Sequence, residues 1–293
     1  MQSSFRVHGT SFSVGMLVLS VLAGCVTRHS APQLTDLFDP KELQRAVTPS
    51  NHRRWEPKLA VLPFAELHGD QLTVRNIRHC EYLSERDYIV RHYDKTFDLN
   101  RLTSVDFMVV PFKNAPSLAH TMLSFGFGDR DYLAVSVEAR LEEGQKYSPI
   151  RGLLRGYELM YVVADERDVI PLRTKHRDAD VYLYRTRATP EQARQLLLDM
   201  MARANKLAFE PEFYDTLTNN CTTNIVDHIN RVTPGKIGPH IGVLLPGLSD
   251  QMAYDAGLLD TNNSFERTKQ QARITGLANR HLAEADFSVK IRR

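Results

Sequence analysis

Cys221 begins a segment whose residues predict a reactive thiol at the start of a helix. Residues 218–220 are small and polar, which suits a helix N-cap, and Ile225, Val226 and Ile229 give the following turns an apolar face. Unpaired N–H groups and the helix dipole favour thiolate there, and with a basic partner they lower a cysteine pKa from about 8.5 to roughly 3.5–7.5. Taken by itself, the pattern favours a small buried structural cysteine over a nucleophile, and the partners upstream decide between the two.

A histidine and a glutamate that could serve this thiol lie in residues 119–140. Two runs of β-forming residues flank the turn at Gly128 and Asp129, which predicts a hairpin. With the turn centred on Asp129, His120 lies across from Glu138 on the same face, with Cβ atoms about 4.5–5.5 Å apart. A carboxylate there orients and charges an imidazole, as in nucleophile–base–orienter triads. A register slip of one residue would separate them, and a solvated strand face is the alternative.

Four further residues are candidates for supporting this site. Backbone N–H groups at the start of the Cys221 helix, helped by Asn220, are expected to hold an oxyanion, and Tyr214 is a candidate for lining the pocket. Arg140 and Arg173 are candidates for balancing charge around the site, with surface ion pairs as the alternative.

The N-terminal residues predict export and lipidation. Residues 1–24 read as a lipoprotein signal peptide, because the apolar run 12–22 is too short to span a bilayer and ends in Leu22-Ala23-Gly24-Cys25, a lipobox. We expect Cys25 to carry the lipid that anchors the protein to a membrane, facing the periplasm. Val26 favours the outer over the inner membrane. An ordinary secretory signal is the alternative.

Composition and charge narrow the classes of function. The chain has 42% hydrophobic and 25% charged residues, as globular proteins do, and its formal charge of +2 with no basic run gives no support to nucleic-acid binding. Besides Cys25, only Cys80 and Cys221 are present, and they could form a disulfide in an oxidising compartment. No histidine has metal-ligand spacing, so neither a metal site nor a cofactor is predicted.

The chain divides into a tether at residues 25–54, a folded domain at 55–247 and a helical extension at 248–293. In the domain, residues 105–112 predict a strand buried on both faces and residues 168–172 a short strand. Thr189, Pro190 and Gln192 predict a capped helix running to about residue 208. Residues 290–293 are expected to form a solvated or membrane-facing tail.

Several motifs resemble one known family. They are His120-Thr121-Met122-Leu123-Ser124-Phe125, Ser136-Val137-Glu138-Ala139-Arg140, Tyr157-Glu158-Leu159, residues 165–170, Arg173 and Asn219-Asn220-Cys221. Over residues 76–230 the chain resembles the Lnb-type N-terminal periplasmic domain family, some of whose members are named for lipoprotein N-acyl transfer. The order of histidine, acidic residue and cysteine is also similar to that of circularly permuted papain-like enzymes such as lecithin retinol acyltransferase.

The resemblance implies an α+β fold, a permuted papain-like antiparallel sheet packed against helices in a single domain. It also implies Cys221 as nucleophile, His120 as base and Glu138 as orienter. We expect a cysteine-dependent acyltransferase or hydrolase that acts on lipid, lipoprotein or peptide acyl groups through a thioester. The alternatives are a cell-wall amidase or peptidase and a non-catalytic envelope binding or assembly lipoprotein.

Overall fold

The computed structural model describes residues 47–292 of the 293-residue chain. The predicted signal peptide, Cys25 and the tether as far as residue 46 lie outside the described residues. The described residues belong to one compact unit. None of their helices combines the length and the apolar character that crossing a bilayer requires.

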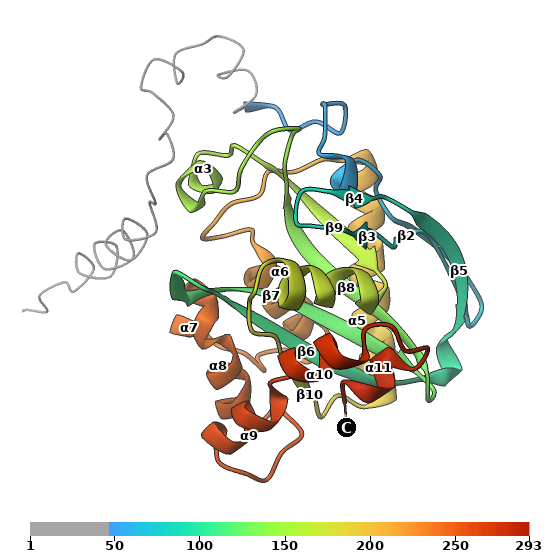
Figure 1. The fold of residues 1–293 in the computed structure, drawn as a ribbon, viewed down its shortest axis with the longest axis vertical. Coiled ribbons are helices and arrows are strands. Elements are labelled where there is room, and N and C mark those ends of the chain that lie inside the picture. Colours follow the sequence, from blue (N-terminus) through green and yellow to red (C-terminus); the bar gives the residue numbers. More distant parts are fainter. Residues whose placement is uncertain (1–46, 293) are drawn as a thin grey trace, which may run out of the picture. The chain divides into compact units, whose positions relative to one another are not determined.

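A mostly antiparallel sheet of eight strands forms the centre of this unit (Figure 1). The strands follow the order β1-β2-β9-β8-β7-β6-β10, β5 also pairs with β2, and the β2–β9 pair is parallel. Their bounds are β1 (Phe64–His68), β2 (Gln71–Arg78), β5 (His92–Asp98), β6 (Leu102–Phe112), β7 (Ala115–Phe127), β8 (Asp131–Arg140), β9 (Glu158–Ala164) and β10 (Tyr182–Arg185). The short strands β3 (Glu81–Tyr82) and β4 (Tyr88–Ile89) pair separately.

Helices cover both faces of the sheet. The α-helices are α3 (Pro149–Leu153), α4 (Glu166–Pro171), α5 (Pro190–Phe209), α6 (Cys221–Val232), α7 (Ile241–Leu244), α8 (Ser249–Asp255), α9 (Phe265–Ala272), α10 (Thr275–His281) and α11 (Phe287–Lys290). Shorter turns are the 3-10 helices η2 (Pro57–Leu59), η3 (Leu99–Arg101) and η5 (Pro246–Leu248) and the π-helical turn η4 (Leu172–His176).

Alternation along the central strands produces two hydrophobic cores. In β7, Leu123 and Phe125 point into a core shared with α5 and α6, and Met122 points into one shared with α4, α10 and α11. Successive side chains of a strand point to opposite faces, so a sheet covered on both sides needs apolar residues at nearly every position. The α5 and α10–α11 layers accordingly lie on opposite sides of the sheet (Figure 1).

Two predicted elements are confirmed. The strand expected at residues 105–112 lies within β6, where the adjacent side chains of Met108 and Val109 are both fully buried. The helix expected at 190–208 is α5, and Thr189 and Gln192 form the predicted capping box. The predicted α+β class is also confirmed, since a mostly antiparallel sheet packs against helices.

Two other predictions are wrong. Residues 168–172, expected as a strand, belong to α4 and the start of η4, because Asp165 caps the helix by accepting the Arg167 N–H. The C-terminal tail is not simply solvated. Arg292 is inserted among the buried side chains of Asp106 and Glu166 and donates to both.

Candidate functional site

Cys221 is the first residue of α6, as predicted. The residue before it, Asn220, caps the helix: its side-chain oxygen accepts the backbone N–H groups of Thr222 and Thr223 at 2.8 and 3.0 Å. The Thr223 hydroxyl accepts the Asn220 N–H in return, which completes a capping box. The thiol is buried, with 5% of the residue exposed.

This capping gives Asn220 a definite role at the start of the helix. Its side-chain oxygen is taken by the two helix N–H groups, and its amide nitrogen donates to the Thr216 carbonyl at 2.8 Å. Asn220 is therefore a positioning residue for the helix start. Within residues 47–292 no acceptor is assigned to the N–H of Cys221 itself, so this is the backbone donor left for a bound oxyanion.

The β7–β8 hairpin has the predicted register, but its ladder ends before His120. Met122 pairs with Ser136, and two residues further along the same register would set His120 opposite Glu138. Beyond this pair β7 stays bonded to β6, with His120 opposite Val110, while β8 stays bonded to β9. The sheet therefore opens between β7 and β8, beside the start of α6, which contacts both strands.

The side chains of His120 and Glu138 meet across this opening. His120 Nε2 lies 3.2 Å from Glu138 Oε1 and 2.7 Å from the Ser136 hydroxyl, which in turn donates to Glu138 Oε1 at 2.8 Å. The His120 and Glu138 side chains are only 14% and 23% exposed. Ser136, which sequence reasoning missed, is fully buried between them and relays their contact. Its position two residues before Glu138 on the same strand face was the available signal.

Cys221 and His120 shift one another's pKa in opposite directions. Burial raises the pKa of the Cys221 thiol, but the hydrogen bond to His120 and the ring's charge outweigh it, and the pKa falls from 9.0 to about 7. Burial lowers the pKa of His120, but the Glu138 charge and the bond to Cys221 raise it from 6.5 to about 9. Both shifts favour a thiolate paired with an imidazolium near neutral pH.

Arg173 takes the position expected of it beside Glu138. It lies on η4, donates to Glu138 Oε1 at 3.2 Å and to the Val169 carbonyl at 2.8 Å, and is 3% exposed. Burial raises the pKa of the Glu138 carboxyl, but the charges of His120 and then Arg173 hold it well below its usual range. Glu138 is therefore ionised next to the imidazolium.

A family comparison covers this site. The family model of the Lnb N-terminal periplasmic domain matches residues 90–244, more than half of the 293-residue chain. The chain belongs to the Lnb N-terminal periplasmic domain family. No curated protein and no solved structure matches it.

The residues matched to the Lnb N-terminal periplasmic domain include His120, Glu138 and Cys221. They leave out Cys80 and the helices from α8 onward, although these helices pack on the same sheet. The site described here thus lies within the residues that the family model matches.

Tyr214 was expected to line the pocket. It is buried in the same core as Cys221, and its hydroxyl lies 3.2 Å from that of Tyr147. Burial raises the pKa of both phenols, and the nearby Cys221 charge raises both further. Tyr147, in the segment between β8 and α3, was not predicted; only the fold brings it to the thiol.

Arg140 does not join the site, which corrects the expectation for it. Its guanidinium donates to the carbonyls of Leu59 and Ala60 and to the side chain of Asn51, and it lies over the Trp55 ring at 4.2 Å. It thus holds the N-terminal segment against the sheet. Arg140 lies two residues beyond Glu138, where β8 continues along β9.

Cys80 has a different environment from Cys221. Both cysteines are free, so the alternative of a disulfide between them is not realised. Cys80 lies beside the buried Arg78–Asp168 ion pair, and its N–H donates to Asp168. Burial, followed by the Asp168 charge, raises the pKa of the Cys80 thiol to about 12. Among residues 47–292 no cluster of histidine, cysteine and acidic side chains could hold a metal ion.

Proposed function

We propose that the protein is a cysteine-dependent acyltransferase or hydrolase of the cell envelope, with Cys221 as nucleophile, His120 as base and Glu138 as orienter. One observation carries this proposal: a helix-start thiol interacts with an imidazole that also contacts a partly buried carboxylate. A buried cysteine with a purely structural role needs no such partners, as the raised pKa of Cys80 illustrates. The Lnb-type family supports a periplasmic setting.

The reaction we infer begins with attack of the Cys221 thiolate on an acyl carbonyl. His120 Nε2 is occupied by Ser136 and Glu138, so we assign the proton exchange with the sulfur to Nδ1. The thiolate forms the C–S bond, the carbonyl oxygen becomes an oxyanion, and the Cys221 N–H stabilises it. His120 then gives its proton to the leaving group as the old acyl bond breaks. An amine or water, deprotonated by His120, attacks the thioester, and the sulfur leaves as thiolate again.

The arrangement supports a papain-like relation. A cysteine opens a helix, and the histidine and the acidic residue lie on neighbouring strands of the antiparallel sheet that this helix covers. Papain-like enzymes divide the same roles between a helix start and a sheet. In this chain the histidine precedes the cysteine, which corresponds to the permuted form.

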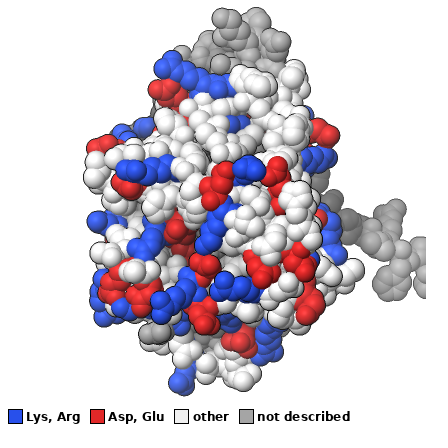
Figure 2. All heavy atoms as spheres, turned by 90° about the vertical axis from the view of Figure 1, so that its right-hand side faces the viewer, with Lys and Arg blue, Asp and Glu red and all other residues white. Residues whose placement is uncertain are grey.

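We also propose that a lipid on Cys25 holds the domain at a membrane, the outer membrane in preference. The substrate we infer is a lipid, a lipoprotein or a cell-wall peptide, each of which presents an acyl carbonyl near that surface. Acidic and basic side chains are interspersed on the face seen in Figure 2, so that face offers no broad patch of one charge.

The test is capture of the acyl-enzyme. Purified full-length protein is incubated with envelope extract, quenched in acid and weighed by mass spectrometry. We expect a hydroxylamine-sensitive adduct on the peptide containing Cys221, the same adduct in a Cys80→Ala variant, and none in Cys221→Ala. An adduct that persists in Cys221→Ala would refute the assignment of the nucleophile. Absence of any adduct, together with an inert thiol, would refute catalysis.

A further inference from the structure

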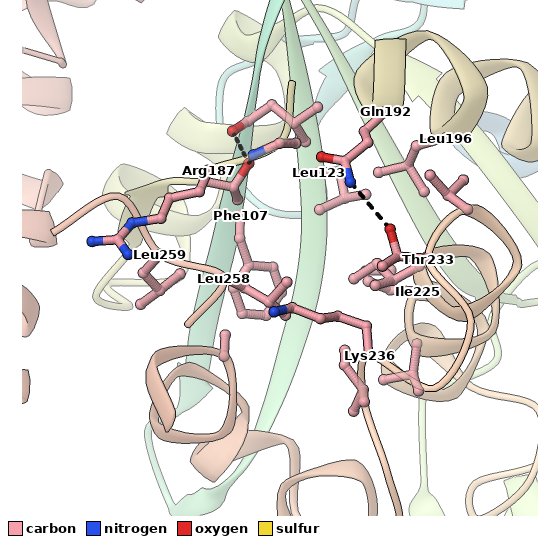
Figure 3. Close-up of a pocket in the computed structure, with 18 of the residues that line it drawn as sticks. Phe107, Leu123, Arg187, Gln192, Leu196, Ile225, Thr233, Lys236, Leu258 and Leu259 are labelled. Atoms are coloured by element: carbon pink, nitrogen blue, oxygen red, sulfur yellow. Dashed lines mark hydrogen bonds between the residues drawn. The ribbon is translucent and has the colours of Figure 1, made fainter. Parts of the chain in front are cut away.

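A cavity of about 260 Å³ lies between α5, α6, α8 and one face of the sheet (Figure 3). It does not open onto the catalytic groups proposed above: the residues that line it do not include Cys221, His120 or Glu138. Thr222 connects the two places. It lines the cavity, and its hydroxyl lies 3.9 Å from the Cys221 sulfur.

The walls of the cavity are aliphatic for most of their extent. Helix α6 contributes Ile225, Val226 and Ile229, and Leu123 and Met252 face them from β7 and α8. The labelled Leu123, Leu196 and Ile225 side chains surround the interior in Figure 3. Walls of this kind bind methylene groups, because each one leaves water for an apolar surface.

One polar group in this wall has no partner in the protein. Ser249, at the start of α8, is fully buried, and within the described part of the chain its hydroxyl has no hydrogen-bond partner. Buried hydroxyls are almost always hydrogen-bonded, because an unpaired one loses its bonds to water without replacement. A ligand oxygen near Ser249 satisfies this requirement.

A cationic side chain lies at the edge of the cavity. In Figure 3 the Lys236 side chain extends towards Leu258, and Lys236 is exposed. Its ammonium forms no hydrogen bond or ion pair with any residue in 47–292, whereas the nearby Arg187 guanidinium donates to the Thr261 carbonyl and the Asn262 side chain. Lys236 is therefore the cation that is free to bind an anionic group.

We propose that this cavity binds the aliphatic chain of a single-chain amphiphile with an anionic head. The chain lies against α6, the head lies at Lys236, and an ester or hydroxyl oxygen bonds to Ser249. This is a second site, separated from the proposed catalytic thiol by Thr222. A ligand bound there packs on the helix that carries Cys221 and restrains it.

Photolabelling of the full-length protein in washed membranes tests the proposal. The probe is a 12-carbon fatty acid with a diazirine at its last carbon, and the labelled residues are mapped by mass spectrometry. We expect labels on α6 and α8 residues of the cavity. A Lys236→Glu variant should reduce labelling at least fivefold, and Lys236→Arg should keep it. Filling the cavity with Ala253→Phe should reduce it at least tenfold, with folding checked by circular dichroism.

Competitors identify the head that the site accepts. An unlabelled 12-carbon fatty acid and a 12-carbon lysophosphatidylglycerol should both compete, and the stronger one identifies a carboxylate or a glycerophosphate head. Dodecyl maltoside, with the same chain and a neutral head, should compete at least fivefold less well. Labels that map elsewhere, or labelling unchanged in both Lys236→Glu and Ala253→Phe, would overturn the proposal.

The same experiment separates this site from the proposed catalytic function. Folded Cys221→Ser protein should be labelled as well as the unchanged protein, because the sulfur does not line the cavity. Loss of labelling in that variant would contradict a second site. Normal cavity labelling with a Cys221 that forms no thioester would instead leave the cavity proposal standing and remove the proposed function.

Discussion

At the scale of residues, the reactivity of Cys221 depends on His120, whose effect on the thiol pKa is larger than the opposite effect of burial. Burial by itself raises a thiol pKa, and this is what happens at Cys80, beside the negative charge of Asp168. At Cys221 burial acts in the same direction, but the interaction with His120 reverses the result. The two cysteines of the described chain therefore differ in charge at neutral pH because of their partners.

Alkylation with iodoacetamide should follow this difference. The rate at Cys221 should rise with pH around a midpoint near 7, because the thiolate reacts, and Cys80 should remain unreacted at that pH. In His120→Ala only the effect of burial on the thiol pKa remains large. We therefore expect the pH midpoint of alkylation at Cys221 to move above 9.0, the ordinary pKa of a thiol. Peptide mapping at a series of pH values measures it, and a midpoint unchanged in His120→Ala would contradict the pairing.

Replacing Glu138 should lower the pKa of His120. The folded pKa of His120, about 9, lies above its ordinary 6.5, so the ion pair stabilises the fold fully below pH 6.5 and loses this contribution as the pH rises through 9. Glu138→Gln removes the counter-charge, and we expect the His120 pKa to fall towards or below 6.5. An NMR titration of the ring measures the pKa. Glu143→Gln, an exposed site whose ion pair is with Arg54, is the matched control.

At the scale of elements, the ends of secondary structure place the functional groups. Helix α6 begins at the thiol because Asn220 caps it, and the ladder between β7 and β8 ends so that His120 and Glu138 can meet. Arg173 lies on a π-helical turn, a distortion that is frequent at functional sites. The end of the chain is placed in the same way: Arg292, next to α11, reaches Glu166 at the start of α4.

Arg292 should be a major determinant of stability. Its guanidinium is 10% exposed and pairs with Asp106 and Glu166, whose side chains are 2% and 0% exposed. Arg292→Met leaves Glu166 without its cation and leaves Asp106 with Arg185 alone. Breaking a buried ion pair in this way costs about 3–5 kcal/mol at pH 7.

The pH dependence of that loss has a definite sign. Without Arg292, burial raises the pKa of both carboxyls, so they bind protons more readily in the folded state and the loss shrinks as the pH falls. Urea unfolding at pH 7 and pH 5 measures this, with the exposed Arg280→Met as control. Equal losses in the two variants would show that the buried cluster does not stabilise the fold.

At the scale of the whole molecule, the arrangement predicted is a folded domain held to a membrane by lipid. A protein with a single acyl chain binds a bilayer only marginally, whereas a protein with two or three acyl chains binds it stably. Cys25→Ser removes the lipidation site, and we expect the protein to move from the membrane fraction to the soluble periplasmic fraction. Fractionation with a carbonate wash and immunoblotting measures this, with Cys80→Ala as the control that should stay in the membrane. Retention of Cys25→Ser after the wash would contradict lipid anchoring.

The sequence alone determined the features that depend on near neighbours. Each of these features follows from residues that lie close together in the sequence. They are the capped start of α6, the capping box of α5, the burial of β6 on both faces and the register of the β7–β8 hairpin. Local caps, turns and periodicity encode such features directly. One local failure was at residues 168–172, where the apolar run suggested a strand and the capping Asp165 ahead of it was overlooked.

Only the tertiary structure decided what depends on distant segments. Arg140 and Arg173 were equivalent candidates in the sequence, but β8 and η4 carry them to different places, and only Arg173 reaches Glu138. The insertion of Arg292 and the cavity behind α6 likewise involve elements far apart in the chain. The physical reason is that the local pattern of apolar residues determines which face of a helix or strand is buried. Tertiary packing determines which other helix or strand covers that face.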